Sequence, residues 1–209
     1  MYDLSRIAWF IQESDAIEGE RSRSLWKTRK LLCERSSVGH VGAFLHLRSV
    51  VQEGDLPYWS DLLYAHELLI REFLDGVVRD DGTSPSSGRE SLPMADIRQK
   101  VSAVRFGASD REAAVDLVAD AHHAFLKARP FTDGDGRISR LYANALLLYF
   151  DLPPAVFTAG DCHGSYYPAC RWKDGHLMRA YLRAKIAHPK CPLTLSSTNG
   201  WIESLPQKL

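Results

Sequence analysis

The chain has 209 residues, of which 45% are hydrophobic and 25% charged, values typical of a soluble protein with one domain or one domain and a small appendage. Its 26 Lys and Arg residues balance its 26 Asp and Glu residues, so the formal net charge is zero. This balance argues against a broad surface for nucleic acid or anionic membranes, and any phosphate recognition must come from a few placed arginine residues.

The N-terminal stretch MYDLSRIAWFIQESDAIEG carries early acidic residues and no long apolar run, which argues against a signal peptide or a membrane span. The four cysteines, Cys33, Cys162, Cys170 and Cys191, lack CxxC spacing. They predict free thiols in a protein that is cytoplasmic or delivered from the cytoplasm. The spacing of Cys162, His163 and Cys170 matches no common zinc pattern.

Apolar residues recur at intervals of three and four along most of the chain, and this spacing predicts a mostly helical fold. A capping box of Ser109 and Glu112 marks the start of the best-defined helix, and Pro130 ends it. The helix that begins after Gly136 is apolar around most of its girth, which predicts a place in the middle of the core. The predicted helices span residues 24–34, 60–77, 109–128, 137–150, 164–172 and 174–187.

Two segments between these helices differ in character. Residues 78–95 are rich in Gly, Ser, Pro and Asp, which predicts a loop. Residues 96–106, DIRQKVSAVRF, alternate well enough to predict a short strand or hairpin. A lone hairpin cannot build a sheet in a helical chain, so we expect it to form a flap over another part of the molecule.

The stretch ARPFTDGDGRISR has the layout of a phosphate-binding loop at the start of a helix. A helix N-terminus offers unpaired N–H groups and a positive dipole end, and Gly134 and Gly136 around Asp135 let the backbone approach an anion. Arg137 and Arg140 lie three residues apart, where both could reach a bound phosphate. The alternative is a plain turn between helices with solvated arginines, because a GxG pattern alone recurs by chance.

The longer pattern resembles the signature of the Fic/Doc family, His-Pro-Phe-x-Asp/Glu-Gly-Asn-Gly-Arg-x-x-Arg, with His122 seven residues before its first position. LLYAHELL, IRQKVSAVRF and GSYYPACRWKDGHLMRAYL also resemble the family's early helix, its target-docking flap and its closing helices. The residues that match the signature are Pro130, Phe131, Asp133, Gly134, Gly136, Arg137 and Arg140.

This resemblance implies an all-α Fic fold, a helical bundle with a short β-hairpin flap. Residues 36–190 would form the Fic domain, residues 1–35 an N-terminal segment with an inhibitory helix, and residues 191–209 a C-terminal tail. A protein target would dock at the flap, through Ile97, Val101 and Val104.

SDAIEG, with Ser14, Glu18 and Gly19, resembles the Ser/Thr-x-x-x-Glu-Gly/Asn motif of Fic proteins that have an inhibitory helix. In those proteins the glutamate pairs with the second arginine of the signature and blocks the γ-phosphate. By this resemblance Glu18 would pair with Arg140, and such a pair occupies the guanidinium that a phosphate would use. The alternative is that Glu18 is a solvated surface acid.

Members of the family typically transfer AMP from ATP to a hydroxyl of a target protein. The resemblance implies that Asp133 holds Mg²⁺ against the α- and β-phosphates. It also implies that the amides of residues 134–136, Asp135 among them, form the anion cradle, while Arg137 and Arg140 bind the outer phosphates. ATP and Mg²⁺ are therefore the expected ligand and cofactor.

Two positions depart from the signature: Arg129 stands in place of the histidine and Asp135 in place of the asparagine. A guanidinium stays protonated, so Arg129 would be a donor and an electrostatic stabiliser, and the loss of a general base typically costs roughly 10²–10⁴-fold in rate. Asp135 would repel a triphosphate unless a metal or an arginine neutralises it. Since the two changes have opposite charge, we hypothesise that Arg129 pairs with Asp135.

The sequence therefore predicts a Fic-type nucleotide-dependent transferase with a diverged, re-purposed active site, and a catalytically inactive nucleotide- or protein-binding module is the alternative. The active form could retain slow AMP transfer, or run altered chemistry with Arg129 stabilising a phosphate and Asp135 or a histidine as base. His122 and His123 are the nearest histidines, about two helical turns back, and we expect them to make hydrogen bonds in the core. The oligomeric state is not predicted.

Overall fold

The computed structural model describes residues 4–21, 26–74, 96, 99–101, 111–131 and 133–187. Within these ranges the chain is helical and holds no strand, which agrees with the predicted all-α class. The described helices are α1 (Leu4–Arg21), α2 (Trp26–Gln52), α3 (Trp59–Leu74), α5 (Arg111–Ala128), α6 (Asp135–Tyr149), α7 (Tyr167–Arg171) and α8 (His176–Ala187), with a short 3-10 turn η2 (Ala159–Asp161) and a π-helical turn η3 (Cys162–Tyr166) before α7.

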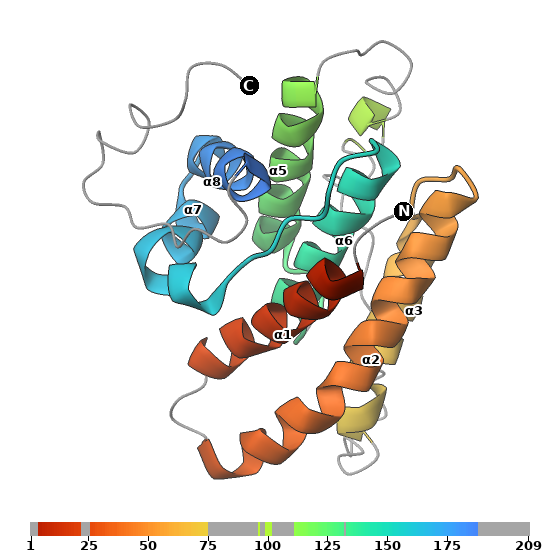
Figure 1. The fold of residues 1–209 in the computed structure, drawn as a ribbon, viewed down its shortest axis with the longest axis vertical. Helices are drawn as coiled ribbons and strands as arrows, with labels where there is room; N and C mark the ends of the chain where they lie inside the picture. The colour runs from red at the N-terminus through yellow and green to blue at the C-terminus, as the bar shows by residue number, and fades with distance from the viewer. Residues whose placement is uncertain are drawn as a thin grey trace.

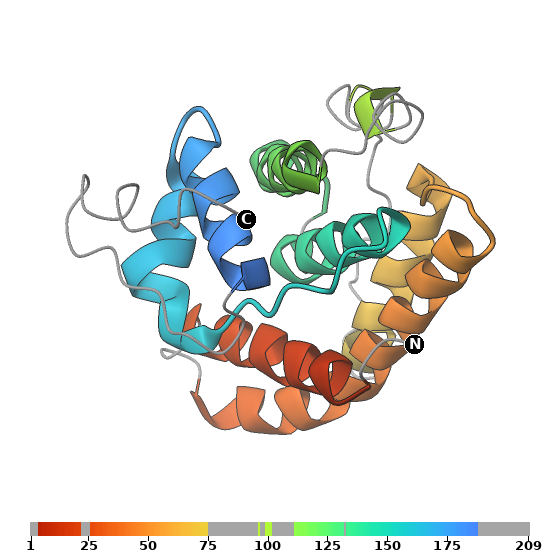
Figure 2. The same cartoon turned by 45° about the horizontal axis from the view of Figure 1, so that its top comes forward.

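Helix α6 runs through the middle of the bundle, as its apolar girth predicts (Figure 1). Every residue from Gly136 to Leu148 is buried. Helices α1, α2, α3 and α5 all contact it, and α8 packs against the other side of α5. In the turned view, α1 crosses the bundle between α6 and the lower part of α2 (Figure 2). The N-terminal end of α6 therefore lies where α1 can reach it.

Helix α2 is much longer than the segment 24–34 that the periodicity predicts. Its second half contains serines and glycines, which have low intrinsic helix propensity, and packing against α3 overrides that propensity. Gly39 lies so close to α3 that a Cβ atom there would collide with the carbonyl oxygen of Leu68. The glycine that weakens the helical pattern in the sequence is thus required for the α2–α3 contact.

Two bidentate ion pairs connect α5 and α8. Asp120 accepts hydrogen bonds from Nε and Nη2 of Arg179, and Asp116 accepts them from Nε and Nη2 of Arg183. The carboxylates and the guanidinium groups are each spaced by four residues but pair in opposite order, so the two helices run antiparallel. We name Asp116, Asp120, Arg179 and Arg183 the α5–α8 ladder.

The predicted hairpin over residues 96–106 is wrong where the structure describes the segment. Asp96 and residues 99–101 are helical, and Asp96 forms an ion pair with Lys100 one helical turn later, at 2.7 Å. Val101 is fully buried in the core. The alternation that suggests a strand also places residues four apart on one face, which suits a helix. The other two predicted docking residues, Ile97 and Val104, lie outside the described residues.

The expected domain boundary between residues 35 and 36 falls within helix α2, and the expected tail 191–209 lies outside the described residues. Cys162 and Cys170 are free thiols, as their spacing predicts. In the part of the chain that the structure describes, no helix combines the length and the apolar character that a membrane span needs.

Candidate functional site

The residue that follows helix α5 is an arginine with unusual backbone geometry. Arg129 has φ of 45°, in the left-handed region that side-chain-bearing residues rarely adopt, and its N–H still bonds the carbonyl of Phe125 at 3.1 Å. Pro130 follows and cannot continue the helix. This turn leaves the Arg129 side chain exposed at the edge of the loop that precedes α6.

Two aspartates close that loop through backbone amides. Oδ1 of Asp135 accepts the N–H of Phe131 at 3.0 Å, and Oδ1 of Asp133 accepts the N–H of Gly134 at 2.8 Å. Gly134 is the N-cap of α6 and has φ of 86°, which favours glycine. Asp135, where the family signature has asparagine, therefore still supplies an oxygen that accepts a loop hydrogen bond.

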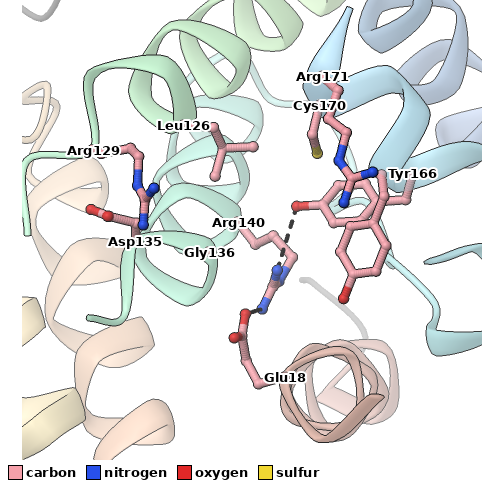
Figure 3. Close-up of a pocket in the computed structure, with 10 residues that line it drawn as sticks. Glu18, Leu126, Arg129, Asp135, Gly136, Arg140, Tyr166, Cys170 and Arg171 are labelled. Atoms are coloured by element: carbon pink, nitrogen blue, oxygen red, sulfur yellow. Dashed lines mark hydrogen bonds and ion pairs between the residues drawn. The ribbon is translucent and has the colours of Figure 1, made fainter. Parts of the chain in front are cut away.

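A cavity of about 250 Å³ opens beside the N-terminus of α6. Figure 3 shows Arg129 and Asp135 on one side of it and Cys170 and Arg171 on the other, with Glu18 and Arg140 between them. The cavity thus brings together the predicted inhibitory segment and the predicted phosphate loop. Its lining consists of Glu18, Leu126, Arg129, Asp135, Gly136, Arg140, Tyr166, Tyr167, Cys170 and Arg171.

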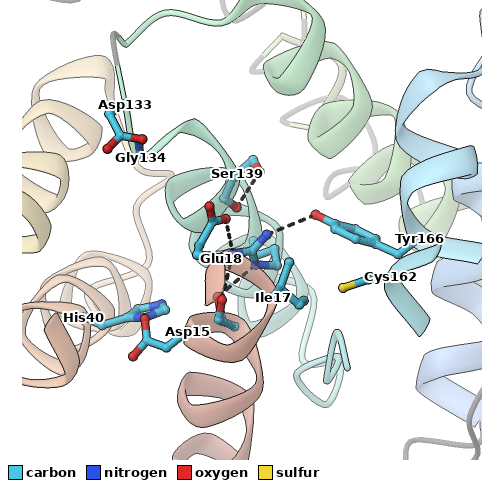
Figure 4. A network of polar contacts seen from close by, with 12 residues as sticks. Asp15, Ile17, Glu18, His40, Asp133, Gly134, Ser139, Cys162 and Tyr166 are labelled. Carbon is cyan, nitrogen blue, oxygen red and sulfur yellow. Dashed lines mark hydrogen bonds and ion pairs between the residues drawn. The ribbon is translucent and has the colours of Figure 1, made fainter. Parts of the chain in front are cut away.

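All three guanidinium nitrogens of Arg140 have hydrogen-bond partners, although only 1% of the residue is exposed. Nη2 donates to Oε1 of Glu18 at 2.8 Å, so the structure contains the pair that the family resemblance implies. Nε donates to Oγ of Ser14 at 2.8 Å, and Nη2 also donates to the carbonyl oxygen of Ser14 at 3.0 Å. Nη1 lies 3.4 Å from the hydroxyl of Tyr166 (Figure 4).

The Glu18 carboxylate lies directly on the backbone of the α6 N-terminus. A Cβ atom added to Gly136 would stand only 2.5 Å from Oε1 of Glu18, so a glycine is needed for the carboxylate to approach this closely. The first turn of a helix is where its amides and its dipole favour an anion. The Glu18 carboxylate therefore occupies a position that both the start of α6 and Arg140 make favourable for a negative charge.

Helix α1 makes further hydrogen bonds and polar contacts with the rest of the bundle. Oδ1 of Asp15 lies 2.8 Å from Nδ1 of the buried His40 on α2, whose pKa burial lowers and Asp15 raises in part. Oε2 of Glu13 accepts the N–H of Ala159 at 2.8 Å, and the hydroxyl of Tyr167 donates to the carbonyl of Ile17 at 3.2 Å. These bonds fix the register that brings Glu18 to Arg140.

The remaining predicted residues are distributed around this centre. Asp133 is exposed on the loop, and Arg137 is 6% exposed, with a charge that lowers the pKa of His66 and His40 after the larger effect of their burial. Gly19 lies in α1, in a part where side-chain surroundings are not described. Arg129 and Asp135 line the same side of the cavity, and their pairing stays a prediction.

The two histidines of α5 make the core hydrogen bonds that the sequence predicts. Nε2 of His122 lies 3.1 Å from the hydroxyl of Tyr166, and Nε2 of His123 lies 2.7 Å from the carbonyl oxygen of Trp172. Burial, with a smaller contribution from the nearby Arg140, lowers the pKa of His122 to about 3, so this ring is neutral. Burial likewise raises the pKa of Cys170 to about 12, which keeps it a thiol.

Sequence reasoning did not assign to this site His66 on α3, or Tyr166, Tyr167, Cys170 and Arg171 in the η3–α7 segment. None belongs to a short motif that contains the loop. They reach it only because the helices pack, so their spacing in the sequence carries no signal of it.

Asp133 suits a magnesium ion that arrives with a nucleotide. Mg²⁺ is commonly bound by one or two carboxylates together with substrate phosphates and waters. Asp133 offers one exposed carboxylate close to the anion-binding end of α6. Among the described residues no group of three or more His, Cys, Asp or Glu side chains could hold a metal without further ligands.

Comparisons with known proteins bear on the middle of the chain. Residues 59–147 match the family model described as Fic/DOC family. The "Protein adenylyltransferase Fic" of Nematostella vectensis is 36% identical over 52 residues, which are 25% of this chain and 12% of that protein.

Two solved chains share the fold. A chain of Fic-1 from C. elegans has a TM-score of 0.59 at 20% identity, and a variant of that protein has a TM-score of 0.60 at 17% identity. Each match covers 88% of this chain and 60% of the solved chain. Identities this low establish a common fold and no more, and this chain spans less than two thirds of each of these relatives.

Proposed function

We propose, since residues 59–147 match the family model described as Fic/DOC family, that this chain is a Fic-type nucleotide-dependent transferase with a diverged active site. Its nucleotide would be ATP with Mg²⁺, bound at the cavity beside α6. The acceptor would be a hydroxyl group of a protein target.

One observation carries the proposal. The Glu18 carboxylate lies against the backbone of Gly136 and is bound to Arg140, at the N-terminus of a helix. A carboxylate and a phosphate group are both anions that accept hydrogen bonds from backbone amides and arginine, so a site that binds one also accepts the other. Helix α1 therefore acts as an internal competitor, and the nucleotide binds when Glu18 leaves.

Different residues would bind the phosphates and the Mg²⁺ of the nucleotide. The amides at the start of α6 and the guanidinium of Arg140 would hold the outer phosphates. Asp133 would hold Mg²⁺, which supplies charge neutralisation on the phosphates when bound. The cavity of about 250 Å³ is small for a ligand site, and the departure of Glu18 would enlarge it.

The chemical step would differ from that of relatives with a histidine base. Arg129 is exposed on the cavity edge and always protonated, so it would stabilise charge on a phosphate rather than accept the proton of the attacking hydroxyl. His122 is neutral, but it is fully buried and bonded to Tyr166. AMP transfer would then proceed without a positioned base, roughly 10²–10⁴-fold more slowly than with one.

The same arginine also favours a second candidate, a Fic-fold module that binds a nucleotide without transferring it. Both candidates predict nucleotide binding after Glu18 is removed. They differ in whether label from ATP is ever transferred, which makes binding and labelling two separate measurements.

Calorimetry of ATP with Mg²⁺ should therefore be run on the wild type, Glu18→Gly and Glu18→Gln. We expect both variants to bind at least tenfold more tightly, since each removes the competing carboxylate. Glu67→Gly is the matched control, because Glu67 is an exposed glutamate on α3 and the change likewise puts a glycine into a helix. Failure of every variant to bind would reject the proposed function.

Labelling with radioactive ATP then separates the two candidates. Glu18→Gly should label itself or a lysate protein slowly, and the triple variant Glu18→Gly/Arg129→His/Asp135→Asn should label at least a hundredfold faster. Binding without any label in Glu18→Gly, together with label in the triple variant, would favour the non-catalytic module.

A further inference from the structure

A histidine on α3 lies directly beneath the phosphate loop. His66 is 0% exposed, and its ring stacks on Phe131 with centroids 3.8 Å apart and planes 4° from parallel. Its Nε2 lies 2.8 Å from the carbonyl oxygen of Asp133. A Cβ atom on Gly134 would lie 3.2 Å from that same Nε2, so the ring also limits the space at the N-cap of α6.

These contacts define which nitrogen of His66 carries the proton. A carbonyl oxygen only accepts hydrogen bonds, so Nε2 must donate to Asp133. Nδ1 is then an acceptor, and it is buried with no partner within hydrogen-bonding distance in the part of the chain that the structure describes. A buried acceptor without a partner is unfavourable, and an apolar ring would avoid it while keeping the stack on Phe131.

We propose that His66 is a positioning residue, which holds the Asp133–Gly134 backbone so that the Asp133 carboxylate faces a nucleotide-bound Mg²⁺. The proposal rests on the proposed function for its ligand. The donated bond fixes the peptide unit between Asp133 and Gly134 from its carbonyl side. The N–H of the same unit bonds Oδ1 of Asp133, so one peptide unit joins the histidine to the carboxylate.

The stack and the hydrogen bond can be separated by substitution. His66→Gln keeps an N–H donor at the place of Nε2 and removes the aromatic ring, whereas His66→Phe keeps the ring and removes the donor. The matched control is His46→Phe, because His46 also packs against an aromatic ring between α2 and α3, edge-on to that of Tyr64, and pairs with Asp61 instead of the loop.

The first readout needs no nucleotide. Hydrogen exchange of the Gly134 and Phe131 amides, which bond the two loop aspartates, reports on the loop itself. We expect His66→Phe to speed exchange at both amides about fivefold, and His66→Gln and His46→Phe to leave it near the wild-type rate. A nitrogen NMR spectrum of the wild type should also place the proton on Nε2 of His66.

The second readout is the affinity for ATP in the Glu18→Gly background, with and without Mg²⁺. His66→Phe should weaken binding about tenfold with Mg²⁺ and much less without it, and His66→Gln should restore most of the loss. Equal losses with and without Mg²⁺, no rescue by glutamine, or a proton on Nδ1 would overturn the proposal. If Glu18→Gly binds no ATP, the proposed function fails, and the exchange rates and the proton position still decide whether His66 holds the loop.

Discussion

The cavity has a floor and a rim, and arginine residues play opposite parts in them. The floor consists of Glu18, Gly136 and Arg140, where an arginine that is 1% exposed binds a carboxylate of the same chain. The rim consists of Arg129 and Arg171, both exposed on facing sides. Gly136 and Arg140 of the floor match the Fic/Doc signature, whereas Arg129 of the rim stands where the signature has histidine.

This difference teaches that burial decides what each arginine of the cavity requires. A buried arginine needs its partners, because an unpaired charge in the core is unfavourable, and so the floor tolerates few changes. An exposed arginine is hydrated whatever its neighbours are, and replacing a histidine with it costs the fold little. Under the proposed function, the rim therefore lacks a base while the floor keeps the partners that the fold needs.

The largest expected effect is on the floor. Arg140→Leu removes donors from Glu18, Ser14 and Tyr166. We expect it to lower the free energy of unfolding by about 3 kcal/mol, because buried polar groups lose their partner. Urea denaturation followed by circular dichroism measures this change.

The control for this variant comes from the α5–α8 ladder. Arg179→Ala also breaks an arginine–carboxylate pair, but the Arg179 side chain is 42% exposed and its partner Asp120 is 38% exposed. An exposed pair contributes little, so its loss should cost under about 1 kcal/mol. Equal costs for the two variants would contradict the difference between floor and surface.

The next expected effect is on the pH dependence of stability, and it comes from His122, at the boundary between the floor and the core. His122 lies behind Tyr166, and burial lowers its pKa from 6.5 to about 3. The folded state therefore binds fewer protons than the unfolded state, and stability falls as the pH drops below 6.5. At about pH 4.5 the loss reaches about 3 kcal/mol relative to pH 7, on a scale of about 1.4 kcal/mol per pH unit.

The variant His122→Gln removes this titration. Urea denaturation at both pH values should show the wild type losing more stability on acidification than the variant does. If the two proteins lose the same amount, His122 takes up its proton in the folded state, and the boundary behind Tyr166 admits water.

Much of the site could be predicted because its residues lie close together in the sequence. The signature residues from Pro130 to Arg140 span one turn of loop and the start of one helix, so their spacing fixes their arrangement. The pairing of Glu18 with Arg140 crosses 122 positions and was predicted only from the second motif. Periodicity likewise located α5 and α6 to within two residues, since both helices have strong apolar patterns.

What the sequence could not show depends on contacts between distant helices. His66 reaches the loop across 67 positions, and nothing in LLYAHELL marks it as different from a core histidine. The second half of α2 was missed because Gly39 and its neighbours have low helix propensity, although Gly39 allows α3 to approach. The helical turn at residues 99–101 was taken for a strand because the short segment 96–106 does not distinguish the two periods.

The smallest expected effect is on the rim, and it tests whether the two exposed arginines take part in binding. In the Glu18→Gly background, Arg129→Ala and Arg171→Ala should each weaken ATP binding about fivefold at low salt, without changing the melting temperature. Exposed charges are screened over roughly 10 Å at 0.1 M salt and roughly 3 Å at 1 M, so the loss should nearly vanish at high salt.

Lys173→Ala is the control for the two rim variants. Lys173 is an exposed positive charge two residues beyond Arg171, and it lies outside the cavity lining. A loss that persists at high salt would mean that these arginines contact phosphate as closely as Arg140 does, and the rim would then be part of the floor. No loss in either variant would leave the floor as the whole of the binding site, and the replacement of the histidine by Arg129 would then serve only to end catalysis.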